Sequence, residues 1–360
     1  MPTDVRASSA RDLYASALAA QRAGRFDDAV RLLWQASQAG DVTAMTLLGG
    51  QLLSGRGAPP DPPNGLRLIF RAAELGGNYA CALAAAITAS GMYAPADWAG
   101  ALDHLQRSAE LGYGPAREQL RLLARRPGQA GSGSGAWKRL RRSVDIEAWR
   151  TPPEARPLSS DPSIRVVERF VPAGICDWII ARAKDRLAPA QVYDAGALKP
   201  RQSDTRTNSF AGFDLVNLDL VMLVVRERLA AAAGLPVLAM EAPQVFHYAV
   251  GQTFAEHFDF LDSAIPGQAQ GLAKGGQRVA TLLVYLNADF EGGETDFPLL
   301  KLKFRGQPGD ALLFTNVEPG GVPDRRMLHA GLPPTSGEKW LLSQWVRDRV
   351  PPGVGGRAAS

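Results

Sequence analysis

The sequence predicts a multidomain protein, in which an N-terminal all-α helical-repeat solenoid precedes a C-terminal α+β domain that closes into a jelly-roll barrel, or double-stranded β-helix. Three observations predict this division. The first part of the chain repeats itself with a fixed period. A Gly/Ser-rich stretch then interrupts the chain after residue 125, and short β-rich runs separated by Gly and Pro follow it.

The composition of the 360 residues is that of a globular protein, with 46% hydrophobic and 21% charged residues. The longest near-continuous apolar runs, Leu229–Met240 and Tyr79–Ala89, are too short to span a membrane. The N-terminus has no basic segment followed by an apolar one, so we expect no secretion signal. Two cysteines far apart in the chain, Cys81 and Cys176, suit a reducing compartment. We therefore expect a cytoplasmic protein that has no membrane partner.

Three segments before residue 125 align with a constant offset of 36 residues, starting at Leu32, Leu68 and His104. Small residues recur at matched places, where they let two helices approach closely, and matched glycines supply the turn between helices. The matched residues are Ala36, Ala72 and Ser108, then Gly40, Gly76 and Gly112, and then Ala44, Ala80 and Ala116. The pattern resembles the Sel-type repeats of the tetratricopeptide superfamily over residues 10–124. Such arrays usually bind protein partners, but the sequence equally allows a stabilising appendage that binds none.

The formal net charge of +4 comes from a single stretch of the chain. Seven basic residues and no acidic one lie from Gln119 to Val144, and acidic residues outnumber basic ones elsewhere. Residues 125–144 are expected to form a basic Gly/Ser-rich linker, and its part Arg126–Ala136, which cannot bury a core, is expected to be flexible. Its basic cluster is either a solvated helix face or a contact for an acidic partner. Because Trp137 is its one aromatic residue, the pattern disfavours nucleic acid as that partner.

The remaining residues, 145–350, alternate short apolar runs with Gly and Pro turns, and a flexible tail is expected over 351–360. Two helical patterns and several strands are expected in this part. The expected helices are Pro172–Ala188 and Leu218–Ala233, and the expected strands are Ile164–Phe170, Gln244–Val250, Arg278–Leu286, Gly309–Phe314 and Lys339–Arg347.

Three of the four histidines of the chain lie in this second part. His257 and Asp259 form an H-x-D pair, and the alternation of an extended segment places both side chains on one face. His329 follows just before another expected strand. Two imidazoles and one carboxylate on one face match the facial triad that holds non-haem Fe(II) and leaves positions open. H-x-D alone is a weak signal, since each histidine also fits a core.

Lys339 begins an expected strand in which Leu341, Ser343 and Trp345 face the same way. A lysine that points into a barrel needs an anion, because burying an unpaired ammonium group is costly. A carboxylate of 2-oxoglutarate would supply that charge. The alternative is a lysine exposed at the start of the strand.

Together these motifs resemble the prolyl 4-hydroxylase branch of the Fe(II)/2-oxoglutarate dioxygenases, over Asp145–Val350. The matching segments are QVFHYAVGQTFAEHFDF, QRVATLLVYLNADFEGGETDFP, PGDALLFTNV and LHAGLPPTSGEKWLLSQWVRDR. The resemblance implies hydroxylation of a prolyl residue in a protein or peptide, with succinate and CO2 as co-products. It also implies Fe(II), 2-oxoglutarate, O2 and ascorbate as a reductant. Free proline or another small molecule stays open as the substrate. An alternative function also stays open, in which the repeats bind a protein and the barrel is inactive. If the substrate is a protein, the repeats would recruit it.

The resemblance further implies a role for individual residues. The implied catalytic iron ligands are His257, Asp259 and His329, the implied 2-oxoglutarate contacts are Lys339, Tyr248, Thr281 and Trp345, and the implied substrate-loop residues are Arg206 and Thr207. His247 stands where the family commonly has arginine, and we interpret it as a structural neighbour. The Gly-rich residues 261–277 are expected to form a lid that bears on the choice of substrate.

Overall fold

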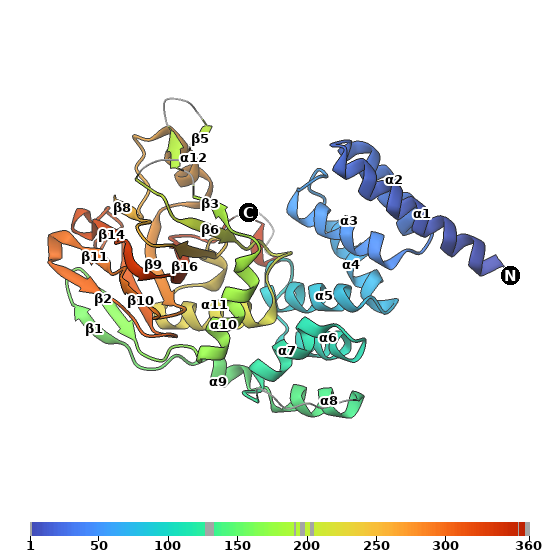
Figure 1. Ribbon diagram of the computed structural model, residues 1–360, viewed down its shortest axis with the longest axis horizontal. Coiled ribbons are helices and arrows are strands. Elements are labelled where there is room, and N and C mark those ends of the chain that lie inside the picture. Colours follow the sequence, from blue (N-terminus) through green and yellow to red (C-terminus); the bar gives the residue numbers. More distant parts are fainter. Residues whose placement is uncertain are drawn as a thin grey trace. The chain divides into compact units, whose positions relative to one another are not determined.

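The computed structural model describes residues 2–126, 133–190, 192–194, 199–201, 205–351 and 353–356. The chain divides into two compact units. The first comprises Met1–Ile146 with Asp214–Leu223, and the second comprises Glu147–Phe213 with Val224–Ser360. In Figure 1 the blue to teal part of the chain is helical, and the labelled strands follow it in the sequence.

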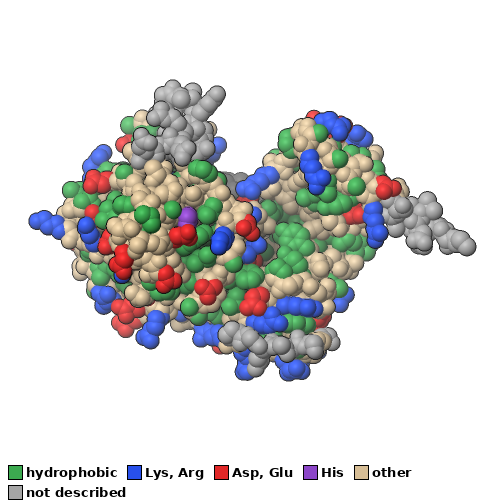
Figure 2. Space-filling model, viewed as in Figure 1, with side chains coloured by type: hydrophobic (Ala, Val, Ile, Leu, Met, Phe, Trp, Pro, Cys, Tyr) green, Lys and Arg blue, Asp and Glu red, His purple; other side chains and the backbone are tan. Residues whose placement is uncertain are grey.

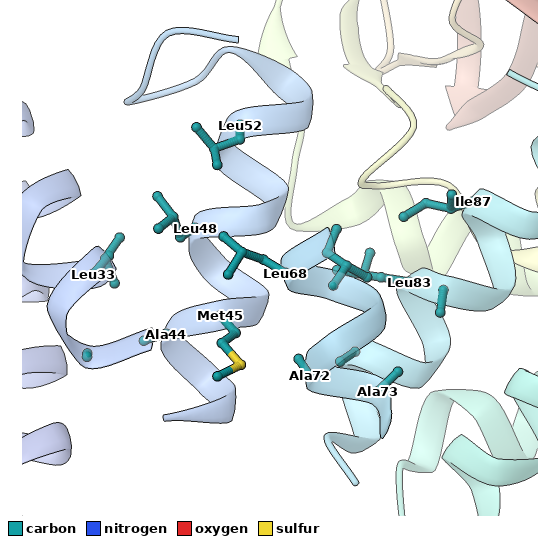
Figure 3. Close-up of a cluster of buried hydrophobic side chains, with 14 of the residues drawn as sticks. Leu33, Ala44, Met45, Leu48, Leu52, Leu68, Ala72, Ala73, Leu83 and Ile87 are labelled. Atoms are coloured by element: carbon teal, nitrogen blue, oxygen red, sulfur yellow. The ribbon is translucent and has the colours of Figure 1, made fainter. Parts of the chain in front are cut away.

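The helices of the first unit pack as hairpins, α1 with α2, α3 with α4 and α5 with α6, and successive hairpins also contact each other. A stack of this kind buries its apolar surface between neighbouring pairs. The helices are α1 (Pro2–Arg22), α2 (Phe26–Gln38), α3 (Val42–Ser54), α4 (Pro62–Glu74), α5 (Asn78–Ser90), α6 (Trp98–Glu110), α7 (Gly114–Leu123) and α8 (Ser134–Ser143). Figure 3 shows Leu68 pointing from α4 toward α3, where it belongs to the same cluster of buried apolar side chains as Leu48.

The matched positions of the 36-residue repeat occupy equivalent places in this stack. All six matched alanines and serines are buried. The three matched glycines, Gly40, Gly76 and Gly112, have φ of +94°, +87° and +91°, a region that strongly favours residues without a Cβ. The predicted helical-repeat solenoid is therefore confirmed, whereas its assignment to the Sel type stays a prediction.

Helices α3 and α4 approach each other closely at a pair of glycines. A Cβ added to Gly49 would lie 2.9 Å from the carbonyl oxygen of Gly65, and a Cβ on Gly65 would lie 2.9 Å from the oxygen of Gly49. Both distances are too short for a real contact. The two helices therefore require glycine at both positions for their present spacing.

The second half of the expected linker is helical, as one of the two interpretations of its basic cluster predicts, and α8 begins at Ser134, within the stretch expected to be flexible. Helix α8 packs against α6 and α7 and buries Trp137, which is 3% exposed. The guanidinium groups of Arg117 and Arg121 each lie 5.2 Å from the centre of the Trp137 ring system. Burial of the indole and these cation–π contacts offset the entropy lost on ordering the segment. Residues 127–132 lie outside the described residues, as does most of the tail expected over 351–360.

Two antiparallel sheets dominate the second unit. The larger has the strand order β1-β2-β13-β9-β16-β7-β6-β3, and the smaller has the order β12-β11-β14-β8. Leu283, Leu312 and Phe314 of the larger sheet pack with Phe297 of the smaller one in a shared apolar cluster. Two sheets that enclose one core in this way form a jelly roll. The predicted fold class is therefore confirmed.

The larger sheet consists of β1 (Arg156–Ser159), β2 (Ile164–Val167), β3 (Ala188–Pro189), β6 (Ser209–Gly212), β7 (Gln244–Tyr248), β9 (Arg278–Tyr285), β13 (Ala311–Thr315) and β16 (Lys339–Arg347). The smaller sheet consists of β8 (Phe254–His257), β11 (Thr295–Phe297), β12 (Leu302–Phe304) and β14 (His329–Gly331). Two further pairs are β4 (Val192–Asp194) with β5 (Lys199–Arg201), and β10 (Phe290–Gly292) with β15 (Pro334–Gly337). The remaining α-helices are α9 (Ile146–Arg150), α10 (Ala173–Lys184), α11 (Leu220–Ala233) and α12 (Pro266–Gly275).

All five expected strands are present, as β2, β7, β9, β13 and β16, and the two expected helices contain α10 and α11. The short strands of the smaller sheet and helix α12 are additions to the sequence prediction. Among the described residues, none of the helices is both long and apolar enough to cross a bilayer.

Candidate active site

The H-x-D pair and the distant histidine meet on the smaller sheet. His257 ends β8 and His329 begins β14, and the two residues are direct partners in the antiparallel register. Asp259 follows β8 and lies with one carboxylate oxygen 3.6 Å from Nε2 of His257 and the other 3.4 Å from Nε2 of His329. One ligand atom from each of the three residues lies within 4.8 Å of the others. The spacing in the sequence thus becomes one compact cluster.

Hydrogen bonds orient both imidazoles toward this cluster. Nδ1 of His257 lies 2.8 Å from the carbonyl oxygen of Ala255, and Nδ1 of His329 lies 2.9 Å from that of Met327. A carbonyl oxygen can only accept, so each Nδ1 carries the proton and donates it. The Nε2 lone pairs then point at the space beside Asp259, which is the tautomer that a metal ligand needs.

Asp259 is fixed from behind by a two-step chain of hydrogen bonds. The hydroxyl of Thr281 donates to Oδ2 of Asp259 at 2.7 Å, and Nδ2 of Asn316 donates to the hydroxyl of Thr281 at 2.9 Å. All three residues are buried. Thr281, which the resemblance places near the co-substrate, is in the structure a partner of the carboxylate.

The protonation of the cluster suits metal binding. Burial, together with the charge of His329, lowers the pKa of His257 to about 3, although Asp259 opposes this. Burial alone would raise the pKa of Asp259, but His329 and His257 lower it below its usual range. The pKa of His329 is raised, because the charge and hydrogen bond of Asp259 outweigh burial. A cation bound beside the Asp259 carboxylate would therefore compete with a proton for Nε2 of His329.

Lys339 lies at the start of β16 and is completely buried, which decides between the two interpretations of this residue. It is 0% exposed, and its Nζ has no hydrogen-bond partner among the described residues. The Nζ lies 5.0 Å from the ring centre of Tyr248 and 5.7 Å from that of Tyr285. Burial lowers the pKa of Lys339 to about 7, against a weak opposing effect of Glu294. The ammonium group is thus ready for an anion that the protein itself does not supply.

One cavity connects Lys339 with the His-Asp-His cluster. The four residues expected to share a face of β16, Lys339, Leu341, Ser343 and Trp345, all line it. The Ser343 hydroxyl and the Trp345 indole N–H are buried without a hydrogen-bond partner among the described residues. The other lining residues are Phe246, Tyr248, Phe254, His257, Asp259, Leu283, Thr295, His329, Ala330 and Gly331. Three unpaired polar groups in one cavity indicate a polar ligand.

Tyr248 is the register partner of Lys339 across β7 and β16, so both side chains enter the cavity at the same level. Burial raises the pKa of Tyr248 above its usual range, which keeps the phenol protonated as a hydrogen-bond donor. Gly331 makes room for it, because a Cβ there would lie 3.0 Å from the phenol oxygen.

The two substrate-loop candidates have different surroundings. The guanidinium of Arg206 lies 4.3 Å from the ring centre of Phe254, which stacks on His257 at 3.5 Å. Nε and Nη2 of Arg206 are buried without a partner among the described residues, and burial lowers its pKa. Thr207 does not line the cavity, and its hydroxyl instead accepts from the backbone N–H of Thr253 at 2.9 Å. The ring of Phe254 therefore lies between Arg206 and the cluster ligand His257, and Thr207 holds its loop in place through the hydrogen bond from Thr253.

His247 faces away from Tyr248, as its position on the strand predicts. Its Nε2 lies 3.2 Å from Glu338, and its ring lies 4.4 Å from that of Trp340, outside the cavity. The lid expected over 261–277 contains helix α12. The sequence interpretation missed Phe254 and a cluster of Glu241, Arg278 and Arg347 beside Trp345. The only signal for that cluster in the sequence was an arginine at one end of each of two expected strands, Arg278 and Arg347.

The geometry fits a metal ion with an anionic co-ligand. Two imidazole nitrogens and one carboxylate on one side leave further coordination positions on the cavity side, a donor set that suits Fe(II). The unpaired ammonium of Lys339 and the indole N–H of Trp345 lie in the same cavity and suit a carboxylate. Both the ligand set and the unpaired donor groups are therefore supplied by side chains of this chain.

Comparison with known proteins agrees with this site. The model of the 2OG-Fe(II) oxygenase superfamily matches residues 243–347. Probable prolyl 4-hydroxylase 7 of Arabidopsis thaliana is 33% identical over 213 residues, which cover 54% of this chain and 66% of that protein. Prolyl 4-hydroxylase 1 of the same plant is 32% identical over 209 residues, which cover 54% and 71%. The chain thus spans about two thirds of these relatives.

A solved structure is also similar to this chain. The viral collagen prolyl hydroxylase of Paramecium Bursaria Chlorella virus-1, in its 2-oxoglutarate complex, is 29% identical, covers 51% of this chain and 94% of its own, and superposes with a TM-score of 0.40. The match of the superfamily model and the identity to the plant proteins identify the family. The chain belongs to the prolyl 4-hydroxylases of the 2OG-Fe(II) oxygenase superfamily.

Proposed function

We propose that the second unit is an Fe(II)- and 2-oxoglutarate-dependent dioxygenase that hydroxylates a prolyl residue in a protein or peptide, with succinate and CO2 as co-products. One observation carries the proposal. Lys339 is 0% exposed and has no partner among the described residues, yet it lines the same cavity as His257, Asp259 and His329. A barrel used only for binding has no reason to bear the cost of that ammonium group.

The residues divide into three roles around this cavity. His257, Asp259 and His329 would hold Fe(II), and Thr281 would keep the Asp259 carboxylate in its ligating orientation. Lys339 and Tyr248 would bind the far carboxylate of 2-oxoglutarate, with Trp345 beside them. When bound, iron and 2-oxoglutarate together supply the oxidation of an unactivated C–H bond. The apolar walls from Phe246, Phe254, Leu283 and Leu341 exclude water from it.

The choice of a prolyl substrate rests on the relatives, which are named as prolyl 4-hydroxylases. Arg206 and Thr207 would support the substrate loop, with Arg206 next to the ring that stacks on His257. We further propose that ascorbate restores oxidised iron and that the helical repeats recruit the protein that carries the proline.

The test incubates the whole chain, loaded with Fe(II), with 2-oxoglutarate, O2 and a peptide of Pro-Pro-Gly repeats. We expect release of succinate and a gain of one oxygen on the peptide by mass spectrometry. His257→Ala abolishes both, whereas His247→Ala, which changes a histidine outside the cavity, retains both. Succinate without peptide oxidation would point to a small-molecule substrate such as free proline. No binding of 2-oxoglutarate by the wild type would refute the proposal and favour an inactive barrel.

A further inference from the structure

Helix α12 in the lid segment (residues 261–277) has no buried residue, so it cannot hold its position by apolar packing. At its base, the Gln277 side chain accepts from the backbone N–H of Leu261 at 2.6 Å and donates to the Leu261 carbonyl at 2.9 Å. Leu261 lies two residues after the cluster ligand Asp259. Segments that bury few apolar side chains are among the first parts of a protein to open. The anchors of α12 therefore determine how ordered the lid segment is.

Arg347, the last residue of β16, anchors the C-terminal end of α12. Its Nη1 donates to the carbonyl oxygen of Gly276 at 2.6 Å, just after α12, and approaches that of Gly271 at 3.5 Å. Its Nε contacts Oε1 of Glu241 at 2.5 Å. A guanidinium at a helix C-terminus satisfies carbonyls that have no partner within the helix.

Glu241 connects this anchor to the wall of the active-site cavity. Oε1 and Oε2 of Glu241 accept from Nε and Nη2 of Arg278 at 2.6 and 3.0 Å, a two-point contact. The guanidinium of Arg278 lies 3.8 Å from the centre of the ring system of Trp345, which lines the cavity. The backbone N–H of Glu241 donates to the carbonyl oxygen of Trp345 at 3.0 Å. The carboxylate is thus fixed next to both arginines.

All three charged side chains of this network are mostly buried. Glu241 is 21% exposed, Arg278 19% and Arg347 14%. Loss of the one carboxylate would leave two neighbouring guanidinium groups without their shared anion, in a place that water reaches poorly. Both arginines would then move, one away from Trp345 and the other away from the end of α12.

We propose that Glu241 is a positioning residue that couples the lid segment to the wall of the active-site cavity at Trp345. Through Arg347 it holds the C-terminal end of α12, and through Arg278 it holds the indole of Trp345. A peptide that presses on the lid segment would therefore change the cavity wall, and an ordered lid segment would favour peptide binding. The role in substrate binding rests on the proposed function, whereas the coupling itself rests on the contacts alone.

Limited digestion with trypsin measures the coupling without any activity. Lys274 in α12 is exposed and is the only lysine or arginine between Asp259 and Arg278. In Glu241→Gln we expect cleavage after Lys274 to be about tenfold faster than in the wild type, because opening of α12 becomes easier. The matched control is Glu291→Gln, which removes an exposed ion pair with Arg305 elsewhere in the same unit and should leave that rate unchanged. Equal rates in the two variants would overturn the proposal.

A second variant separates local coupling from general loss of stability. Arg347→Lys keeps a positive charge beside Glu241, but a single ammonium group cannot reach both the carboxylate and the Gly276 carbonyl. We expect it to speed cleavage at Lys274 while the contact of Arg278 with Trp345 remains. A rise in cleavage at all tryptic sites, with a lower thermal midpoint, would show a merely structural role and overturn the proposal.

Kinetics then test the link to the substrate. In Glu241→Gln the KM for the peptide of Pro-Pro-Gly repeats should rise about tenfold through the lid segment, and the KM for 2-oxoglutarate should rise as well, because Trp345 lies beside the proposed 2-oxoglutarate site. In Arg347→Lys, which keeps the contact of Arg278 with Trp345, only the KM for the peptide should rise, and an equal rise in both KM values there would contradict the assignment. If the wild type shows no turnover, the proposed function fails, but the trypsin experiment still decides on the coupling.

Discussion

Lys339 is buried in the barrel, and its pKa is well below that of an exposed lysine. An exposed lysine stays charged far above neutral pH, but burial lowers the pKa of Lys339 to about 7. Near neutral pH the free protein therefore holds this amine partly neutral. A bound carboxylate favours the charged form and raises the pKa again, so binding of the anion takes up a proton when the pH is above about 7.

This proton uptake predicts a pH dependence of co-substrate binding. We expect the Kd for 2-oxoglutarate to be lowest below pH 7 and to rise by up to about tenfold per pH unit above it. Calorimetric titration of Mn(II)-loaded protein between pH 6 and 8.5 measures this, and buffers of different ionisation enthalpy count the protons. Lys339→Met should bind weakly at every pH, whereas Lys303→Met, an exposed lysine on β12, should behave as the wild type. A constant Kd over this range would contradict the prediction.

Thr281 offers a second test at this scale. Thr281→Val keeps the shape of the side chain but removes the hydroxyl that donates to Asp259 at 2.7 Å. The carboxylate then loses its orienting partner, and we expect the affinity for Fe(II) to fall about tenfold, measured by competition with a chelator. Thr315→Val on the adjacent strand β13 is the matched control. Unchanged affinity would show that the cavity alone orients Asp259.

Sequence patterns predict those residues of the site whose spacing along the chain is characteristic. His257, Asp259, His329 and Lys339 follow from an H-x-D pair, a strand start and strand alternation, all local patterns. The network of Glu241 with two arginines could not be predicted in this way. Its members are 37 and 69 residues apart along the chain, and they meet only because β16 pairs with β9 and because Met240 forms a bridge with Val346.

At the scale of elements, sequence patterns found the long strands and missed the short ones. Strands β9 and β16 contain eight and nine residues, enough for their apolar content to be recognised. Strands β11, β12 and β14 contain three each, too few to show alternation. Helix α12 was missed because three of its ten residues are glycine, which disfavours helices.

The close approach of α3 and α4 predicts opposite effects for two neighbouring glycines of one helix. Gly49→Ala places a Cβ 2.9 Å from the Gly65 carbonyl oxygen, so we expect a loss of about 1–3 kcal/mol in the free energy of unfolding. Gly50→Ala meets no atom within 4 Å and should stabilise the helix by up to about 1 kcal/mol. Urea unfolding followed by circular dichroism measures both. Equal effects of the two substitutions would show that the helices can separate at no cost.

For the whole molecule, the surface charge now has a structural explanation. Helix α8 buries Trp137 and exposes Lys138, Arg139 and Arg142, while Arg141 forms an ion pair with Asp103 at 2.7 Å. Lys and Arg side chains gather along the lower edge in Figure 2, where Figure 1 places α8. The solvated helix face expected from the sequence accounts for this cluster.

The division into two compact units predicts two separate unfolding transitions in differential scanning calorimetry. Mn(II) with 2-oxoglutarate should raise the midpoint of only one transition, because only the second unit holds the site. At 100 times the Kd, the ligand adds about 2.7 kcal/mol, which corresponds to roughly 5–10 °C for a unit of this size. In Lys339→Met this shift should be largely lost. A single transition that moves as a whole would contradict the independence of the units.

Helix α8 also has a consequence for how the repeat array can change in length. It follows the last repeat without sharing its pattern, and its tryptophan packs beside the arginines of α7. Terminal elements of this kind close a stack that otherwise offers an apolar face to a further unit. A protein engineer who wants a longer array should therefore insert whole repeats before α7. A new repeat that is added after α8 would find no apolar face on which to pack.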